Sequence, residues 1–222
     1  PLGPTPHPIP WLATPGEPSA TGLVLPFYWR EAQWSDGKPV TADDFVFSWR
    51  RILDPAIAST YAYFLYLVKN AAAINAGKLP GTALGVRAIN ARTFEIQLVH
   101  PAPYLLEMLT HTATMPLPRH VVPAKGNGWS MPGNFVGNGP YIPTQWIPND
   151  HLTLVRNPKF YDAAHVHIGV VNYYSSPDSN ASLRRFRAGE FDTQTPIPLT
   201  QIDCLRTHLP GELHTKPILG LS

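Results

Sequence analysis

The sequence predicts a mixed α/β protein in which sheets carry flanking helices, and three observations lead to this prediction. A capped amphipathic helix follows an extended aromatic segment near residue 40. Two alternating apolar and polar runs lie on either side of a short turn near residue 91. After residue 119, strand-like and helix-like segments alternate, which is typical of an α/β lobe.

The composition allows a real hydrophobic core and excludes several classes of protein. The chain has 222 residues, of which 44% are hydrophobic, so it could form one large or two small domains. Its formal charge is only +2, and its sequence has no basic stripe that would bind nucleic acid. Its one cysteine, Cys204, excludes an intramolecular disulfide and a zinc ribbon. The longest apolar run, 61–68, is too short to span a bilayer, and no secretion signal opens the chain.

The first third of the chain is organised around the run WSDGKPVTADDFVFSWRR, residues 34–51. Asp36-Gly37 predicts a tight turn, because glycine accepts positive φ. Thr41 can cap the following helix, and Asp44 completes a capping box three residues later. Phe45, Trp49 and Ile52 recur at helical spacing and predict a buried face.

The segments around this run are assigned from their turn and breaker residues. Residues 1–20 hold seven prolines and predict an extended lead-in that packs poorly. The segment 23–30 resembles a strand, and Pro26 predicts that it lies at a sheet edge. A second helix is expected over 61–76, ended by Gly77. A hairpin over 86–89 and 93–98 follows, and then a short helix over 101–110 that turns Leu105, Leu106 and Leu109 inward.

The second half begins at the run Met115-Pro116-Leu117-Pro118, where we expect a lobe boundary. Strands are expected at Trp146 and over 152–155, followed by a chain reversal at Asn157-Pro158. Further segments are then expected in the order strand 168–174, helix 181–187 begun by Ser176-Pro177 and ended by Gly189, helix 198–205 and strand 213–219.

No set of residues in the sequence predicts catalysis, a cofactor or a metal site. Gly128-Trp129-Ser130 is followed by Met131-Pro132, which is not a nucleophile elbow. Cys204 falls in a predicted amphipathic helix and is expected to be a small buried residue. His165 and His167 have a ligand-like spacing but lack a third ligand. Arg184, Arg185 and Arg187 predict a solvated basic face.

Four motifs resemble one family, the extracytoplasmic solute-binding proteins of ABC transporters, family 5, in the subgroup that binds oligopeptides and dipeptides. Residues 34–51 are similar to its signature WS-[DN]-G-x-PVTA-x-DFV-x-SW-x-R. The runs 138–141, 156–162 and 189–192 resemble its turn before a strand pair, its RNP-x-YWD run and a short GE-[IF]-D strand.

The resemblance implies the fold of a type II-like periplasmic binding protein, present here in part. Residues 1–118 would be the accessory small lobe, and residues 119–222 would be part of the first ligand-binding α/β lobe. Relatives are more than twice this long, so the chain resembles a fragment that lacks the opening strands and the C-terminal lobe.

The function implied is that of a periplasmic or extracytoplasmic substrate-binding component of a peptide ABC transporter. It would act as a monomer, without cofactor or nucleic acid, enclosing short peptides between lobes by hinge closure and delivering them to a membrane permease. Tyr61 would contact the ligand, because Ser59-Thr60-Tyr61-Ala62 matches a Ser-x-Tyr-Ala segment that lines the cleft in relatives. Gln194, Thr195 and Leu219 are the other expected ligand-binding residues.

Three alternatives stay open at this point. Tyr61 could be a plain core residue, since it belongs to an apolar and aromatic stripe. The chain could be a family member that binds nickel, a sugar or an opine, because the fold is shared. It could also be a noncatalytic interaction or chaperone-like protein with an exposed aromatic surface.

Overall fold

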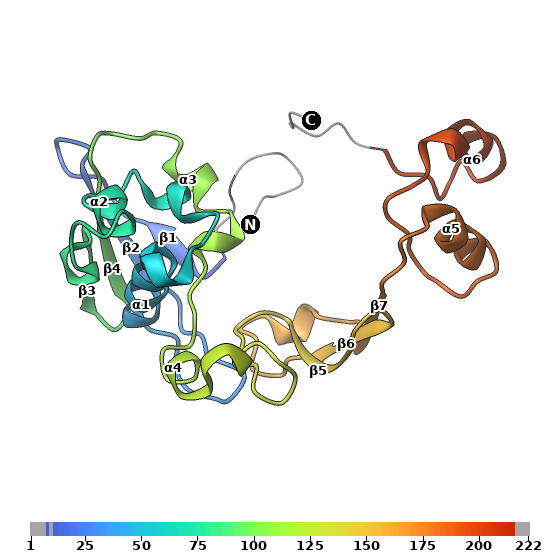
Figure 1. The fold of residues 1–222 in the computed structure, drawn as a ribbon, viewed down its shortest axis with the longest axis horizontal. Helices are drawn as coiled ribbons and strands as arrows, with labels where there is room; N and C mark the ends of the chain where they lie inside the picture. The colour runs from blue at the N-terminus through green and yellow to red at the C-terminus, as the bar shows by residue number, and fades with distance from the viewer. Residues whose placement is uncertain (1–7, 9–10, 216–222) are drawn as a thin grey trace. The chain divides into compact units, whose positions relative to one another are not determined.

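The computed structural model describes Pro8 and residues 11–215, and these residues form two compact units (Figure 1). The first unit runs to Trp146 and also takes in Thr153–Val171. The second unit takes Ile147–Leu152 and the chain from Asn172 onward. The predicted mixture of sheets and helices is confirmed, and no helix among residues 11–215 is long and apolar enough to cross a membrane.

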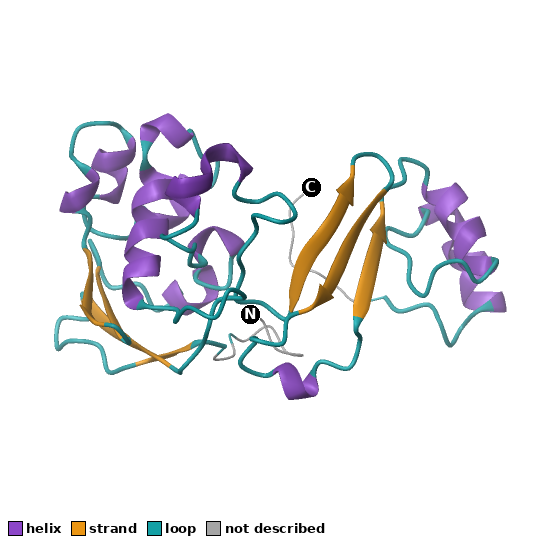
Figure 2. Cartoon of the chain, turned by 90° about the horizontal axis from the view of Figure 1, so that it is seen from below, coloured by secondary structure: helices purple, strands orange, loops and turns teal. Residues whose placement is uncertain are grey.

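The first unit is built on a four-stranded antiparallel sheet with the strand order β1-β2-β4-β3. Its strands are β1 Ala13–Pro15, β2 Val24–Trp29, β3 Val86–Asn90 and β4 Thr93–Gln97. Alternate side chains such as Phe27, Phe94 and Ile96 are buried, as the two-residue period of a strand requires. In Figure 2, most of the helices of this unit lie on one face of the sheet.

The lead-in over residues 1–20 is extended where it supplies β1, as expected. One expectation for this sheet is wrong, since β2 lies inside the sheet instead of at its edge. Pro26 is tolerated there because β1 is short. The ladder between β1 and β2 stops at the pair Pro15↔Phe27. After that pair, the Pro26 carbonyl still accepts a hydrogen bond from the Gly16 N–H at 2.8 Å, and no ladder bond requires an N–H from Pro26.

Helix α1, Ala42–Leu53, begins with the predicted capping box of Thr41 and Asp44. The Asp44 carboxylate accepts hydrogen bonds from the Thr41 N–H at 2.9 Å and the Thr41 hydroxyl at 3.1 Å. One face of the helix packs on the sheet, where Phe45 stacks on Trp29 with ring centroids 4.0 Å apart. The predicted buried face is therefore confirmed.

Short helical turns complete the first unit. They are η1 Pro55–Ile57, η2 Ala62–Leu65, α2 Ala71–Asn75, η3 Gly81–Ala83, α3 Leu105–Met108, η4 Thr112–Thr114, α4 Val122–Lys125, η5 Gly126–Gly128 and η6 Ala163–His165. The helix expected over 101–110 is thus shorter than predicted, although its three leucines do face the core as expected.

The helix predicted over 61–76 is wrong, because the chain leaves the helical path between η2 and α2. There the backbone pairs with the end of β4 and the segment that follows it, through Lys69 N–H to Gln97 O at 2.8 Å and Val99 N–H to Leu67 O at 2.9 Å. Asn70 then adopts a left-handed conformation, with φ 68°, before α2 starts. The predicted ending at Gly77 is confirmed, with φ 72° and its N–H bonded to Ile74 O.

A three-stranded sheet follows with the order β5-β6-β7, formed by β5 Tyr141–Ile147, β6 His151–Arg156 and β7 Val170–Tyr174. The three predicted strands are thereby confirmed. The reversal expected at Asn157-Pro158 is fixed by Asn157, whose side-chain amide donates to Gly139 O at 2.8 Å. Asn157 is almost fully buried, so this bond replaces the water that its amide would otherwise need.

The second unit contains α5 Ser179–Arg187, η7 Leu199–Gln201 and α6 Ile202–His208. Both predicted helices exist, but α5 is capped by Asp178 instead of being started by Ser176-Pro177. The short strand expected over 189–192 is wrong, because the chain forms a turn in which Glu190 N–H donates to Arg185 O. Most of the strand expected over 213–219 lies outside the described residues.

Candidate ligand-binding site

Tyr61 lies at the start of η2 and presents its ring at the surface of the first unit, with 49% of the residue exposed. Its ring centroid lies 6.1 Å from that of Phe64 and 4.8 Å from that of His111. The alternative that Tyr61 is a plain core residue does not fit this exposure. A phenol exposed in this way can offer both a flat apolar face and a hydroxyl to a ligand.

The neighbouring turn holds His111 against this pair of rings. His111 caps η4 and accepts the Ala113 N–H on Nδ1 at 3.1 Å. The turn is fastened to α1, because Trp49 Nε1 donates to Thr114 O at 2.9 Å and Ser48 Oγ donates to Met115 O at 2.7 Å. The aromatic cluster of Tyr61, Phe64 and His111 therefore rests on a hydrogen-bonded support.

The other predicted ligand residues lie elsewhere. Gln194 and Thr195 belong to the second unit, and Leu219 lies outside the described residues. The Gln194 side-chain amide donates to Ser179 O at 3.0 Å and to Pro196 O at 3.1 Å. Its side-chain oxygen is buried and meets no donor among the described residues. Thr195 is exposed.

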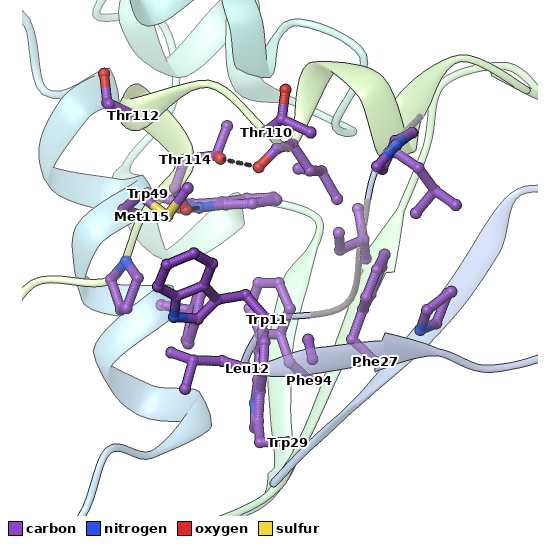
Figure 3. Close-up of a pocket in the computed structure, with 18 of the residues that line it drawn as sticks. Trp11, Leu12, Phe27, Trp29, Trp49, Phe94, Thr110, Thr112, Thr114 and Met115 are labelled. Atoms are coloured by element: carbon purple, nitrogen blue, oxygen red, sulfur yellow. Dashed lines mark hydrogen bonds between the residues drawn. The ribbon is translucent and has the colours of Figure 1, made fainter. Parts of the chain in front are cut away.

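An aromatic cavity of about 530 Å³ lies inside the first unit, between the sheet, α1 and the segment 106–116 (Figure 3). Three tryptophans and three phenylalanines line it, namely Trp11, Trp29, Trp49, Phe27, Phe45 and Phe94. Its size falls within the range of pockets that enclose small organic molecules. No local pattern in the sequence predicts this cavity, because each of these aromatic residues taken singly is typical of a packed core.

Few polar groups reach this cavity. Thr110, Thr112 and Thr114 line one side, and the Thr114 hydroxyl is already bonded to the carbonyls of Leu109 and His111. The Trp29 indole nitrogen is buried and finds no acceptor within the described part of the chain. The cavity would therefore suit a largely apolar molecule.

The two histidines with ligand-like spacing have no third metal ligand beside them among the described residues. His165 ends η6 and pairs with Asp162, whose carboxylate raises the pKa of the His165 imidazole through a hydrogen bond and its charge. His165 belongs to the helical turn η6, whereas His167 lies beyond its end. Among residues 8 and 11–215, no group of three histidine, cysteine, aspartate or glutamate side chains could hold a metal ion.

The expectation that Cys204 is buried is wrong, since the thiol is exposed on α6, where Leu205 is the buried side chain. His208 Nδ1 lies 3.6 Å from the thiol sulfur and 2.8 Å from Cys204 O. A carbonyl only accepts, so Nδ1 carries a proton and cannot remove one from the thiol. The pair does not form a nucleophile and base.

The predicted basic face of α5, in the second unit, is partly occupied by contacts of Arg185 within that unit. The Arg185 guanidinium donates to Glu190 at 2.7 Å and lies 4.2 Å from the centroid of the Phe191 ring. Phe191 in turn stacks on Tyr174. This arrangement fixes the turn after α5 and leaves Arg185 little freedom to bind an anion.

Comparison with known proteins finds close relatives among curated sequences. The chain is 43% identical over 190 residues to a probable deoxycholate-binding periplasmic protein of Escherichia coli K12, covering 85% of this chain and 35% of that protein. It is 39% identical over 217 residues to the periplasmic oligopeptide-binding protein of Salmonella typhimurium LT2, covering 96% and 40%. The chain thus spans less than half the length of these relatives.

Solved structures agree with the sequence relatives. The Escherichia coli murein tripeptide-binding protein matches with a TM-score of 0.87 and 34% identity, over 91% of this chain and 40% of that one. The Haemophilus influenzae oligopeptide-binding protein, in complex with RPPGFSPFR, matches with a TM-score of 0.85 and 32% identity, over 94% and 46%. The family described as bacterial extracellular solute-binding proteins, family 5 Middle, matches residues 7–217. The chain therefore belongs to family 5 of the bacterial extracellular solute-binding proteins.

Proposed function

We propose that this chain is part of a substrate-binding protein that captures short peptides and delivers them to a membrane ABC permease. The observation that carries the proposal is its match, over more than nine tenths of its length, to the tripeptide-binding and oligopeptide-binding structures. The protein would work outside the cytoplasm, as a monomer and without catalytic activity. Its affinity would come from main-chain hydrogen bonds, which do not depend on the side chains of the peptide.

In this proposal residues 1–118 form the accessory lobe and residues 119–222 belong to the first ligand-binding lobe. Tyr61 would present its ring to the peptide from the accessory lobe. Gln194 and Thr195 of the second unit are proposed as further ligand-binding residues, and so is Leu219.

The peptide proposal is tested on Tyr61 with Tyr63 as the matched control. Both are exposed tyrosines of the same turn, at 49% and 55%, but only Tyr61 is within ring contact of His111. In the whole gene product that carries this chain, we expect Tyr61→Ala to weaken tri- to pentapeptide binding about tenfold, the usual effect of truncating an aromatic contact.

Calorimetric titration measures this effect, and we expect Tyr63→Ala to change the affinity less than twofold. Equal losses in both variants would contradict a specific role for Tyr61. Failure of the unaltered protein to bind any peptide would overturn the proposed function itself.

A second candidate ligand is an amphipathic fused-ring molecule, favoured by the aromatic cavity of the first unit. Such a molecule would place its apolar rings against the tryptophans that line the cavity. The relative named as a probable deoxycholate-binding protein makes deoxycholate the natural probe.

Tryptophan fluorescence reports on this cavity, because Trp11, Trp29 and Trp49 line it. We expect deoxycholate, added below its micelle-forming concentration, to change the emission in a saturable way. Leu109→Phe, which adds bulk at the cavity wall, should abolish the change, whereas Leu79→Phe at an exposed position away from the cavity should not. The absence of a saturable change in the unaltered protein would remove this candidate.

A further inference from the structure

The turn over residues 34–38 is closed by its own hydrogen bonds and anchored in the core of the first unit. Trp34 N–H donates to Lys38 O at 2.7 Å, and Gly37 N–H donates to Trp34 O at 2.8 Å. The Trp34 side chain is buried, and its indole nitrogen donates to the Asp44 carboxylate at 3.3 Å. The turn and the first residues of α1 are therefore joined as one hydrogen-bonded body.

Polar groups of this turn bind two segments that follow the predicted lobe boundary. His120 Nε2 donates to the Asp36 carboxylate at 2.6 Å. Ser35 N–H donates to Gly137 O at 2.8 Å, and Gly137 N–H donates to Ser35 Oγ at 3.3 Å. The turn thus holds residue 120 through one side chain and residue 137 through a pair of hydrogen bonds.

The start of α1 binds the first of these segments as well. Arg119 N–H donates to the Asp44 carboxylate at 3.2 Å. The Arg119 guanidinium also lies 3.7 Å from the Asp43 carboxylate and 3.8 Å from that of Asp44. The side chains of Arg119 and Asp43 are half exposed, so these charge pairs contribute less than the backbone hydrogen bond to buried Asp44.

These contacts continue into the strands beyond the boundary. The segment held at Gly137 leads to Gly139 and Pro140, whose carbonyls accept hydrogen bonds from the side-chain amide and the N–H of Asn157, each at 2.8 Å. Asn157 directly follows β6. Since α1 also supports the turn below Tyr61, it is fastened to residues on both sides of the predicted boundary.

We propose that residues 34–44 form a clasp that fixes the segment 119–140 relative to the aromatic cluster of Tyr61, so that Ser35 and Asp36 are positioning residues for ligand capture. This inference rests on the proposed function, in which ligand-binding residues lie on both sides of the boundary. When the clasp is open, only a fraction of the molecules holds these residues in the binding arrangement. The apparent affinity falls by that fraction, although neither side chain touches the ligand.

Aromatic contacts also cross the predicted boundary and limit the effect of opening the clasp. The rings of Trp11 and Phe160 have centroids 5.8 Å apart, and the Arg30 guanidinium lies 4.7 Å from the centroid of the Tyr161 ring. These contacts remain when the hydrogen bonds of the clasp are removed. We therefore expect clasp variants to loosen the segment 119–140 and to keep the fold.

A clasp that acts as a unit predicts that the loss of one bond loosens the segment held by another. Asp36→Ala removes the acceptor of His120 and leaves both bonds between Ser35 and Gly137. In the whole gene product, we expect the amide of Gly137 to exchange about fivefold faster in this variant, as measured by hydrogen exchange and mass spectrometry. Ser35→Ala should in turn speed exchange over 119–122. Unchanged exchange in the segment that each substitution does not touch would overturn the clasp.

Peptide affinity tests the positioning role. In calorimetric titrations with a tripeptide, we expect Asp36→Ala combined with Ser35→Ala to bind about fivefold more weakly than the unaltered whole gene product. Asp36→Asn should restore most of the affinity in the presence of Ser35, because its amide can donate to Nε2 of a neutral His120 imidazole. Glu95→Ala is the control, since it removes a carboxylate of the same unit that pairs with Arg87 at 2.7 Å, outside the clasp.

The control should keep the affinity of the unaltered protein. Full affinity in the double variant would overturn the positioning role, and so would an equal loss in Glu95→Ala. Asp36→Asn that binds as weakly as Asp36→Ala would show that the hydrogen bond to His120 is not what positions the segment.

The two proposals fail in different ways. If the unaltered protein binds no peptide, the proposed function is wrong, and the exchange measurement, which needs no ligand, still decides whether the clasp acts as a unit. If peptides bind and the double variant keeps the full affinity, only the role of the clasp is wrong.

Discussion

One carboxylate, that of Asp44, fastens the start of α1 to distant parts of the first unit. Asp44 accepts hydrogen bonds from Thr41, from Trp34 Nε1 at 3.3 Å and from the Arg119 N–H at 3.2 Å. Only 2% of Asp44 is exposed, so these donors replace the water it loses on folding. The capping part of this role follows from the sequence, because it needs residues three apart. The bond to Arg119 does not, because that residue lies 75 positions away.

The neighbouring turn residue Asp36 provides a prediction about pH. Burial raises the pKa of its carboxyl group. Hydrogen bonds from His120 and the Lys38 N–H, together with the charges of the His120 and Lys38 side chains, lower this pKa by more than burial raises it. The net pKa therefore lies below the ordinary 3.8. A carboxyl whose pKa is depressed by folding contributes stability above its unfolded pKa and loses it as the pH falls through the folded value.

We therefore expect the melting temperature to fall below about pH 4 partly because Asp36 becomes protonated. Asp36→Asn should show a shallower fall over that range than the unaltered chain, as followed by circular dichroism. Asp43→Asn, at a half-exposed side chain of the adjoining helix, should keep the original slope. Identical acid profiles for all three proteins would contradict the contribution of Asp36.

At the scale of elements, the segment between η2 and α2 shows where local patterns mislead. Its apolar spacing is helical, yet residues 67–69 pair with the end of β4 and the backbone that follows it. Asn70 makes the change of direction possible, because asparagine tolerates left-handed backbone and its side-chain amide donates to Ala83 O at 2.7 Å. The break between the two helices therefore depends on this residue.

Substitution of Asn70 separates these two contributions. Asn70→Gly loses the side-chain hydrogen bond but keeps the left-handed conformation, so we expect a loss of about 1 kcal/mol in the free energy of unfolding. Asn70→Ala loses the bond and adds backbone strain, so the loss should reach about 2–3 kcal/mol. Urea denaturation measures both values. Equal losses for glycine and alanine would show that the left-handed conformation carries no energetic weight.

At the scale of the whole molecule, local signals predicted most elements, and distant contacts accounted for the errors. The capping box, the hairpin and the ending at Gly77 are encoded within a few residues, and all three are confirmed. The aromatic cavity and the contact between Tyr61 and His111 join segments that are 50 or more residues apart, so no local pattern signals them. The exposure of Cys204 was missed because a short helix with little to pack on buries only one residue.

The distribution of buried side chains predicts that the two units open independently and at different free energies. Nearly all of the buried apolar residues belong to the first unit. Among the described residues of the second unit, the buried apolar side chains are Leu183 and Leu205. Local opening is easiest where few apolar contacts are lost. We expect amide hydrogens of α5 and α6 to exchange far faster than those of α1.

Hydrogen exchange of the 222-residue chain, followed by mass spectrometry, measures this difference. The comparison of α1 with α5 is well matched, because both helices have a polar residue at the N-cap with hydrogen-bonded capping. They differ in burial, since seven residues of α1 are buried and only Leu183 of α5 is. Because helix stability in proteins comes mainly from packing, α1 should be protected to nearly the global limit and α5 should not. Equal protection of the two helices would mean that α5 has a partner surface in solution that its own unit does not supply.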